Sequence, residues 1–251
     1  MKIWAAALGA AILLLPCGAF AQTSSAPVRH LVYSFTWGTS NDTQMHTSGM
    51  SDSVNAPGGN SMGTASGMVD YTGGTNDKGT ITVDVLREQP DTGLVVDVSE
   101  QANERRSAPA ATCVVFSDTT IVCDPTKRIN AEELTLLRYL GVHFVDPLQL
   151  DAKQHWKVSR SGAISTTSDY TISKNADSAM TIDEVRVVTE SGAKPETTNV
   201  NATIGYDFKK TVPTSVTEYA IMRSEQGEQY NTVKTQTILT LQSDSMTAAK
   251  N

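Results

Sequence analysis

Residues 129–141 read INAEELTLLRYLG, and this stretch predicts the one helix around which the fold is organised. Asn130 is a favoured residue at a helix N-cap, and Glu133 stands at the position from which its carboxylate can accept a bond from the cap backbone. Ile129 and Leu134 occupy the two positions of a hydrophobic staple. Together these signals fix where the helix begins.

The predicted helix has an apolar side and a clear end. Leu134, Leu137 and Leu140 recur every three residues and are expected to share one face. Gly141 is typical of the residue that ends a helix. A helix of about three turns must bury such a face against other elements, and strands are the partners that this chain offers.

Most of the remaining chain alternates between apolar and polar residues, which is the period of half-buried strands. Gly73 to Asp77 are expected to form a turn, and residues 38–61 a loop or an irregular hairpin. Strands are expected at residues 28–37, 62–72, 80–87, 93–99, 156–164, 169–173, 180–190, 200–208, 216–223 and 230–242.

We therefore predict a mainly β fold, in which a curled antiparallel sheet of two meander halves, half-barrel or clam-like, surrounds one central α-helix. One helix cannot cover every apolar strand face, so the sheet must curl around it or its halves must face each other. The expected shape resembles that of the periplasmic lipoprotein carriers, in architecture alone.

The first 21 residues have the pattern of a secretory signal peptide, with Lys2, a short apolar run over residues 5–15 and small residues at Ala19 and Ala21. The protein is therefore expected to be exported, to the periplasm or the extracellular space. Lipid anchoring at Cys17 is the alternative. The apolar run is too short to span a bilayer, and no transmembrane segment is expected in the mature chain.

Five segments are predicted along the chain. They are the signal peptide (1–21), an N-terminal β meander (22–110), a disulfide hairpin with the central helix and a connector (111–156), a C-terminal β meander (157–243) and a flexible tail (244–251).

Two cysteines remain after removal of the signal peptide, which indicates a disulfide in an exported chain. If residues 117–119 form a turn, Phe116 pairs with Thr120, and Cys113 then lies opposite Cys123. This spacing favours a structural disulfide over a redox-active pair, because no Cys-x-x-Cys motif is present.

The formal net charge of −7 is dispersed along the chain, which argues against nucleic acid as a partner. We find no catalytic constellation, no phosphate-binding loop and no metal-ligand spacing among the four histidines. No catalytic residue, metal site or cofactor is therefore predicted. These observations favour a protein that is not an enzyme.

Three functions stay open on the sequence. The first is a non-enzymatic binding or carrier module that holds an apolar small molecule, lipid or lipidated partner in a groove between sheet and helix. The second is a structural or envelope-interaction protein with a closed core, and the third an enzyme of unrecognised type. The oligomeric state stays open. The residues predicted to line the groove are Tyr33, Phe35, Trp37, Leu134, Leu137 and Leu140.

Overall fold

The computed structural model describes residues 27–45, 73–89, 93–116, 120–140, 151, 153–176, 179–192, 196–226 and 229–246. The predicted signal peptide with Cys17, the predicted strand 62–72, Gly141 and residues 247–251 lie outside this part of the chain.

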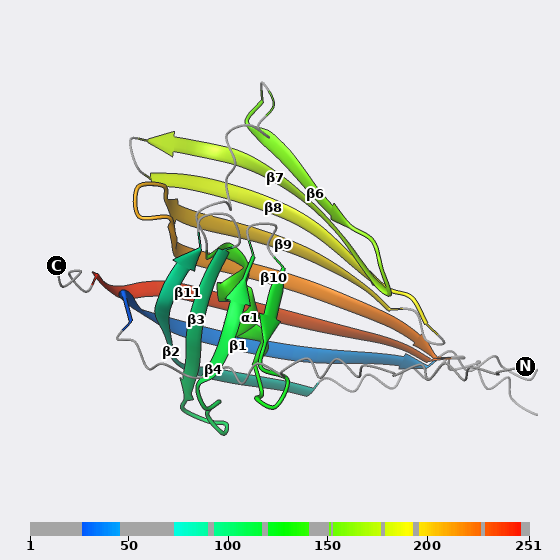
Figure 1. The fold of residues 1–251 in the computed structure, drawn as a ribbon. Coiled ribbons are helices and arrows are strands. Elements are labelled where there is room, and N and C mark those ends of the chain that lie inside the picture. The colour runs from blue at the N-terminus through cyan, green and yellow to red at the C-terminus, as the bar shows by residue number, and fades with distance from the viewer. Residues whose placement is uncertain are drawn as a thin grey trace, which may run out of the picture.

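One antiparallel sheet of eleven strands and one helix make up the regular structure of the described residues (Figure 1). The elements are β1 (Arg29–Met45), β2 (Gly73–Gln89), β3 (Gly93–Ala102), β4 (Ala111–Val115), β5 (Ile121–Cys123), α1 (Ala131–Tyr139), β6 (His155–Arg160), β7 (Ile164–Ala176), β8 (Ala179–Glu190), β9 (Glu196–Asp207), β10 (Val212–Gln226) and β11 (Gln229–Met246). The strand order is β5-β4-β3-β2-β1-β11-β10-β9-β8-β7-β6.

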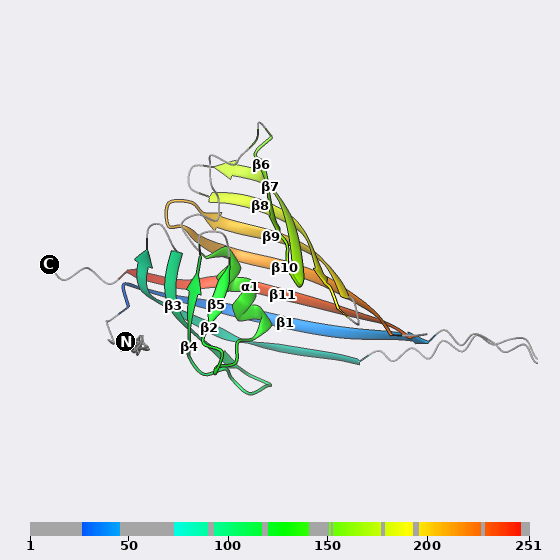
Figure 2. The same cartoon turned by 45° about the vertical axis from the view of Figure 1, so that its right-hand side comes forward.

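The order of the strands explains the shape of the sheet. Strands β1 to β5 form one meander and β6 to β11 another, and the two meet where β1 pairs with β11. Figure 2 shows that β4 and β5, at one end of the sheet, and β6, at the other end, bend toward the side where α1 lies. The predicted fold class, a curled antiparallel sheet with one helix, is confirmed. No helix of the described residues has the length and apolarity needed to cross a membrane.

Four irregularities in pairing help the sheet to bend. The register shifts at Val32/Tyr33 in β1, Val85/Arg87 in β2, Ile172/Lys174 in β7 and Pro213/Ser215 in β10. An extra residue on one strand of a pair increases the local twist and bends that strand. The sequence predicted a curled sheet because one helix cannot cover every apolar strand face. These irregularities in the strands help to produce that curl.

The inner face of the sheet carries the hydrophobic core. Tyr33 is fully buried there, and its hydroxyl donates a hydrogen bond of 2.9 Å to the Pro213 carbonyl. Gly79 lies beneath the Phe35 ring, where a Cβ atom would come within 2.7 Å of the ring. The fully buried strand residues of this core are Leu31, Tyr33, Ile81, Val83, Val96, Val98, Cys113, Ile182, Ile204, Val216 and Leu239.

Helix α1 begins as the sequence predicted, but its buried surface is wider than one stripe. The Asn130 backbone amide donates a 2.7 Å hydrogen bond to the Glu133 carboxylate, as expected for a capping box. Leu137 and Leu140 are buried, whereas Leu134 is 37% exposed. Because the sheet curls around the helix, most of its faces are covered, and only the line through Ala131, Leu134 and Arg138 stays open.

Two sequence-based expectations about loops are wrong. Residues 38–45, expected to begin a loop, continue β1, and Gly73 to Asp77, expected to form a turn, begin β2. Gly38 to Asn41 pair with β2 on one side and with β11 on the other. Backbone pairing on both sides supplies the stability that this weakly alternating stretch lacks.

The predicted cysteine hairpin is confirmed. The Phe116 amide donates a 2.8 Å hydrogen bond to the Thr120 carbonyl, and Cys113 pairs with Cys123 across β4 and β5. A disulfide joins these two residues, whose Cα atoms are 4.0 Å apart. A disulfide of this kind indicates an oxidising environment such as that of exported proteins.

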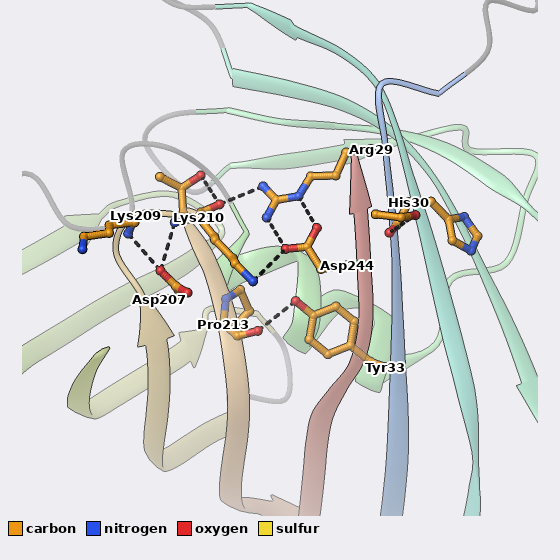
Figure 3. Close-up of polar contacts among 10 residues, drawn as sticks. Arg29, His30, Tyr33, Asp207, Lys209, Lys210, Pro213 and Asp244 are labelled. Atoms are coloured by element: carbon orange, nitrogen blue, oxygen red, sulfur yellow. Dashed lines mark hydrogen bonds and ion pairs between the residues drawn. The ribbon is translucent and has the colours of Figure 1, made fainter. Parts of the chain in front are cut away.

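An ion pair stabilises the junction between the two meanders, where β1 pairs with β11 (Figure 3). Arg29 in β1 donates two hydrogen bonds of 2.8 Å to the Asp244 carboxylate in β11, and a third of 2.7 Å to the Lys210 carbonyl. Both side chains are largely buried, at 12% and 9% exposure. Asp244, expected from the sequence to begin a flexible tail, lies in β11, where it pairs with Leu31 of β1. The bonds from Arg29 hold the pKa of Asp244 below its usual range.

We expect the Asp244→Asn substitution to lower the free energy of unfolding by about 2 kcal/mol at pH 7, because it leaves Arg29 largely buried without its charged partner. Chemical denaturation at pH 7 measures this. The control is Asp183→Asn on the outer face, where an amide oxygen can still accept the 2.9 Å bond from Thr203. Equal effects of the two substitutions would contradict the role given to the junction.

Candidate functional site

A pocket of about 280 Å³ lies between α1 and the strands β6, β7 and β8. Helix α1 contributes the open side described above, and the strands contribute inward-facing residues spaced two apart. The described residues that line the pocket are Ile121, Leu134, Arg138, Val158, Arg160, Ile164, Thr166, Ser168, Tyr170, Arg186 and Val188.

One part of this lining is apolar and still open to solvent. Leu134 is 37% exposed and Ile164 is 56% exposed, while Val158 is partly buried. These side chains come from the helix and from two neighbouring strands. Among the described residues, these side chains thus form a small apolar surface that is still open to solvent.

The other part of the lining is polar and cationic. Arg138, Arg160 and Arg186 contribute guanidinium groups, and Thr166, Ser168 and Tyr170 contribute hydroxyls. No acidic side chain occurs among the described residues that line the pocket.

Arg186 forms the floor of the pocket and is fixed by two buried carboxylates. Its guanidinium lies 3.0 Å from Glu184 and 2.8 Å from Glu218, and Arg186 is only 3% exposed. Burial alone would lower the pKa of Arg186, but the Tyr139 oxygen and the two carboxylates outweigh it and raise that pKa. The same cluster holds α1, because the Tyr139 hydroxyl donates to Glu184 and the Thr135 hydroxyl to Glu218.

A second buried cluster fixes the other side of α1. Arg105 pairs with Asp77, Glu100 and Glu132, which is in the first turn of the helix. Its guanidinium centre also lies 5.0 Å from the centre of the Trp37 ring. We call these two groups, around Arg105 and around Arg186, the polar belt of the helix.

The residues predicted to line a groove fall into two groups. Tyr33, Phe35, Leu137 and Leu140 are buried together in the core, and Trp37 packs against that core beneath Arg105. Only Leu134 lines the pocket. Sequence reasoning missed the three arginines, as well as Ile164 and Val188.

A signal for one of these arginines was present in the sequence. Residues 182–187 read IDEVRV, and the alternation places Ile182, Glu184 and Arg186 on one face of the strand. Two opposite charges on the same face as a core isoleucine indicate a buried ion pair, because an unpaired charge would be too costly there.

Comparisons with known proteins assign no family. No family model matches the chain, and no curated protein matches it. A solved structure described as "Lipid-protein interactions in lipovitellin" is similar to this chain over 90% of its residues, with 9% sequence identity and a TM-score of 0.48. The chain spans about a quarter, 26%, of the length of that protein.

A buried carboxyl of the capping box, Glu133, predicts an unusual pH dependence of stability. Burial raises the pKa of Glu133 to about 7, and the neighbouring Glu100 carboxylate acts in the same direction, against the Asn130 amide and Arg105. A raised pKa favours the protonated folded state. This contribution to stability is complete below the pKa of the unfolded chain, near 4.5, and is lost as the pH rises through 7.

We therefore expect the free energy of unfolding to fall between pH 5 and pH 8 by on the order of 2 kcal/mol from this group. Glu133→Gln should flatten that slope, because glutamine still accepts the bond from Asn130 but does not titrate. The exposed Glu104→Gln is the matched control. The assignment fails if Glu133→Gln and wild type lose stability in parallel over this range.

Proposed function

We propose that this protein is an exported, non-enzymatic binding or carrier module that holds an apolar ligand, a small molecule or lipid chain, in the pocket between α1 and β6–β8. The observation that carries the proposal is the pair of exposed apolar side chains, Leu134 and Ile164, at one pocket. Covering apolar surface contributes about 25 cal/mol per Å². At about 280 Å³, the pocket is near the lower end of the usual range for small-molecule sites.

The proposed location is the periplasm or the extracellular space. The disulfide between Cys113 and Cys123 supports an oxidising compartment. The signal-peptide pattern of residues 1–21 supports export, and lipid anchoring at Cys17 is the alternative to a free mature chain.

A structural or envelope-interaction role is the second candidate, and one observation favours it. Four of the six residues predicted for the groove, Tyr33, Phe35, Leu137 and Leu140, are packed in a filled core. On this alternative the pocket beside Leu134 is a surface depression that binds nothing. A direct binding measurement separates the two.

The test is fluorescence titration with the neutral apolar probe N-phenyl-1-naphthylamine. We expect saturable binding by the wild-type protein and at least a tenfold loss of affinity in Leu134→Lys, because a charge would then stand on the apolar side of the pocket. Leu134 is partly exposed, so the substitution should leave the fold intact, which circular dichroism checks.

The matched control is Val185→Lys. Val185 is 56% exposed and lies on the face opposite that of Glu184 and Arg186, away from the pocket. The Val185→Lys variant should bind the probe with the same affinity as the wild-type protein. Absence of saturable binding by the wild type would refute the carrier proposal and favour the closed-core alternative.

A further inference from the structure

The strands beneath the pocket alternate cationic and apolar residues in two adjacent rows. Val158 pairs with Ser168, which pairs with Arg186, and the next row runs from Arg160 through Thr166 to Val188. Each row thus has a valine at one end, an arginine at the other and a hydroxyl between them. The two arginines stand at opposite corners of this patch.

Helix α1 adds a third arginine above the patch. Arg138 is one turn from Leu134 on the open side of the helix, and its guanidinium lies 3.5 Å from Glu218. Glu218 also binds Arg186, and the two arginines together lower the pKa of Glu218 despite its burial. Glu184 and Glu218 are therefore both engaged with arginines, and the polar groups of the described residues that line the pocket are guanidiniums and hydroxyls.

This combination matches the chemistry of an anionic amphiphile. Guanidinium groups bind carboxylate and phosphate with two parallel hydrogen bonds, and hydroxyls can donate further bonds to the same oxygens. The exposed Leu134 and Ile164 offer contact to a hydrocarbon chain. A purely apolar ligand would make no polar contact with the guanidiniums, and a cationic ligand would be repelled by them.

We propose that the pocket selects single-chain amphiphiles with an anionic head group, a carboxylate or a phosphate, over neutral and cationic ones. This inference rests on the proposed function, because it names the ligand class of the same pocket. The head group is bound by Arg138 and Arg160, and the chain lies against Leu134, Val158 and Ile164. Arg186 lines the pocket but stays paired with Glu184 and Glu218.

The experiment compares three probes that share a ten-carbon chain and differ in charge: decanoate, decanol and decyltrimethylammonium. Each probe is titrated against the complex of the full-length mature protein with N-phenyl-1-naphthylamine, and displacement of the naphthylamine is measured. The titrations are made at low ionic strength and below the micellar concentration of each probe. We expect decanoate to bind at least tenfold more tightly than decanol, and decyltrimethylammonium to bind most weakly. Added salt should reduce the preference. Decyl phosphate, as a fourth probe, decides between phosphate and carboxylate as the better head group.

Substitutions of the two arginines test whether they are the source of the preference for an anionic head group. Arg138→Gln and Arg160→Gln, singly and together, should weaken decanoate binding at least tenfold in the double variant and change decanol binding less than twofold. Arg160→Lys should restore part of the preference, because it restores the charge. Arg223→Gln, at an exposed position on the outer face of β10, is the matched control and should bind all probes as the wild type does.

The outcomes separate this inference from the function on which it rests. If neither decanol nor the neutral naphthylamine binds, the proposed function fails and this inference with it. If the three probes bind equally, or decanol binds best, only the head-group inference is overturned. A decanoate preference that persists in the folded double variant would also overturn it.

Discussion

Buried charge must be paired, and this constraint fixes the position of helix α1 on the sheet. Arg186 lies between Glu184 and Glu218, and Arg105 lies among acidic residues that include Glu132 of the helix itself. An unpaired charge at any of these sites would cost several kcal/mol. Close packing of Leu136 and Leu137 already favours one position of the helix, and the paired charges add a large cost to any shift from it.

The fixed helix divides the inner face of the sheet into two regions. On one side, Leu137 and Leu140 close a filled core against the strands. On the other, Leu134 and Arg138 face strands β6 to β8 across a pocket lined by described residues. The polar belt bonds α1 to β8 and β10, and the pocket lies beside these contacts, between the helix and β6 to β8.

Local signals predicted the parts of this structure that depend on local physics. The capping box at Asn130, the hairpin that joins Cys113 to Cys123 and the alternation of the strands are all set by residues close in sequence. The extension of β1 to Met45 depends on pairing with two distant strands, and the exposure of Leu134 depends on how the sheet curls. The alternation of residues 182–187 indicates Arg186, but Arg138 and Arg160 come from two other elements, and no local pattern brings the three together.

Hydrogen exchange of the backbone amides of α1 tests the central claim most directly. If the polar belt fixes the helix, the amides of Leu136, Leu137 and Tyr139 should exchange only with the opening of the core strands, and Arg186→Met should speed their exchange more than that of Ile204 in the core of β9. Exchange of these helix amides at the rate of a free peptide in the wild-type protein would contradict the account.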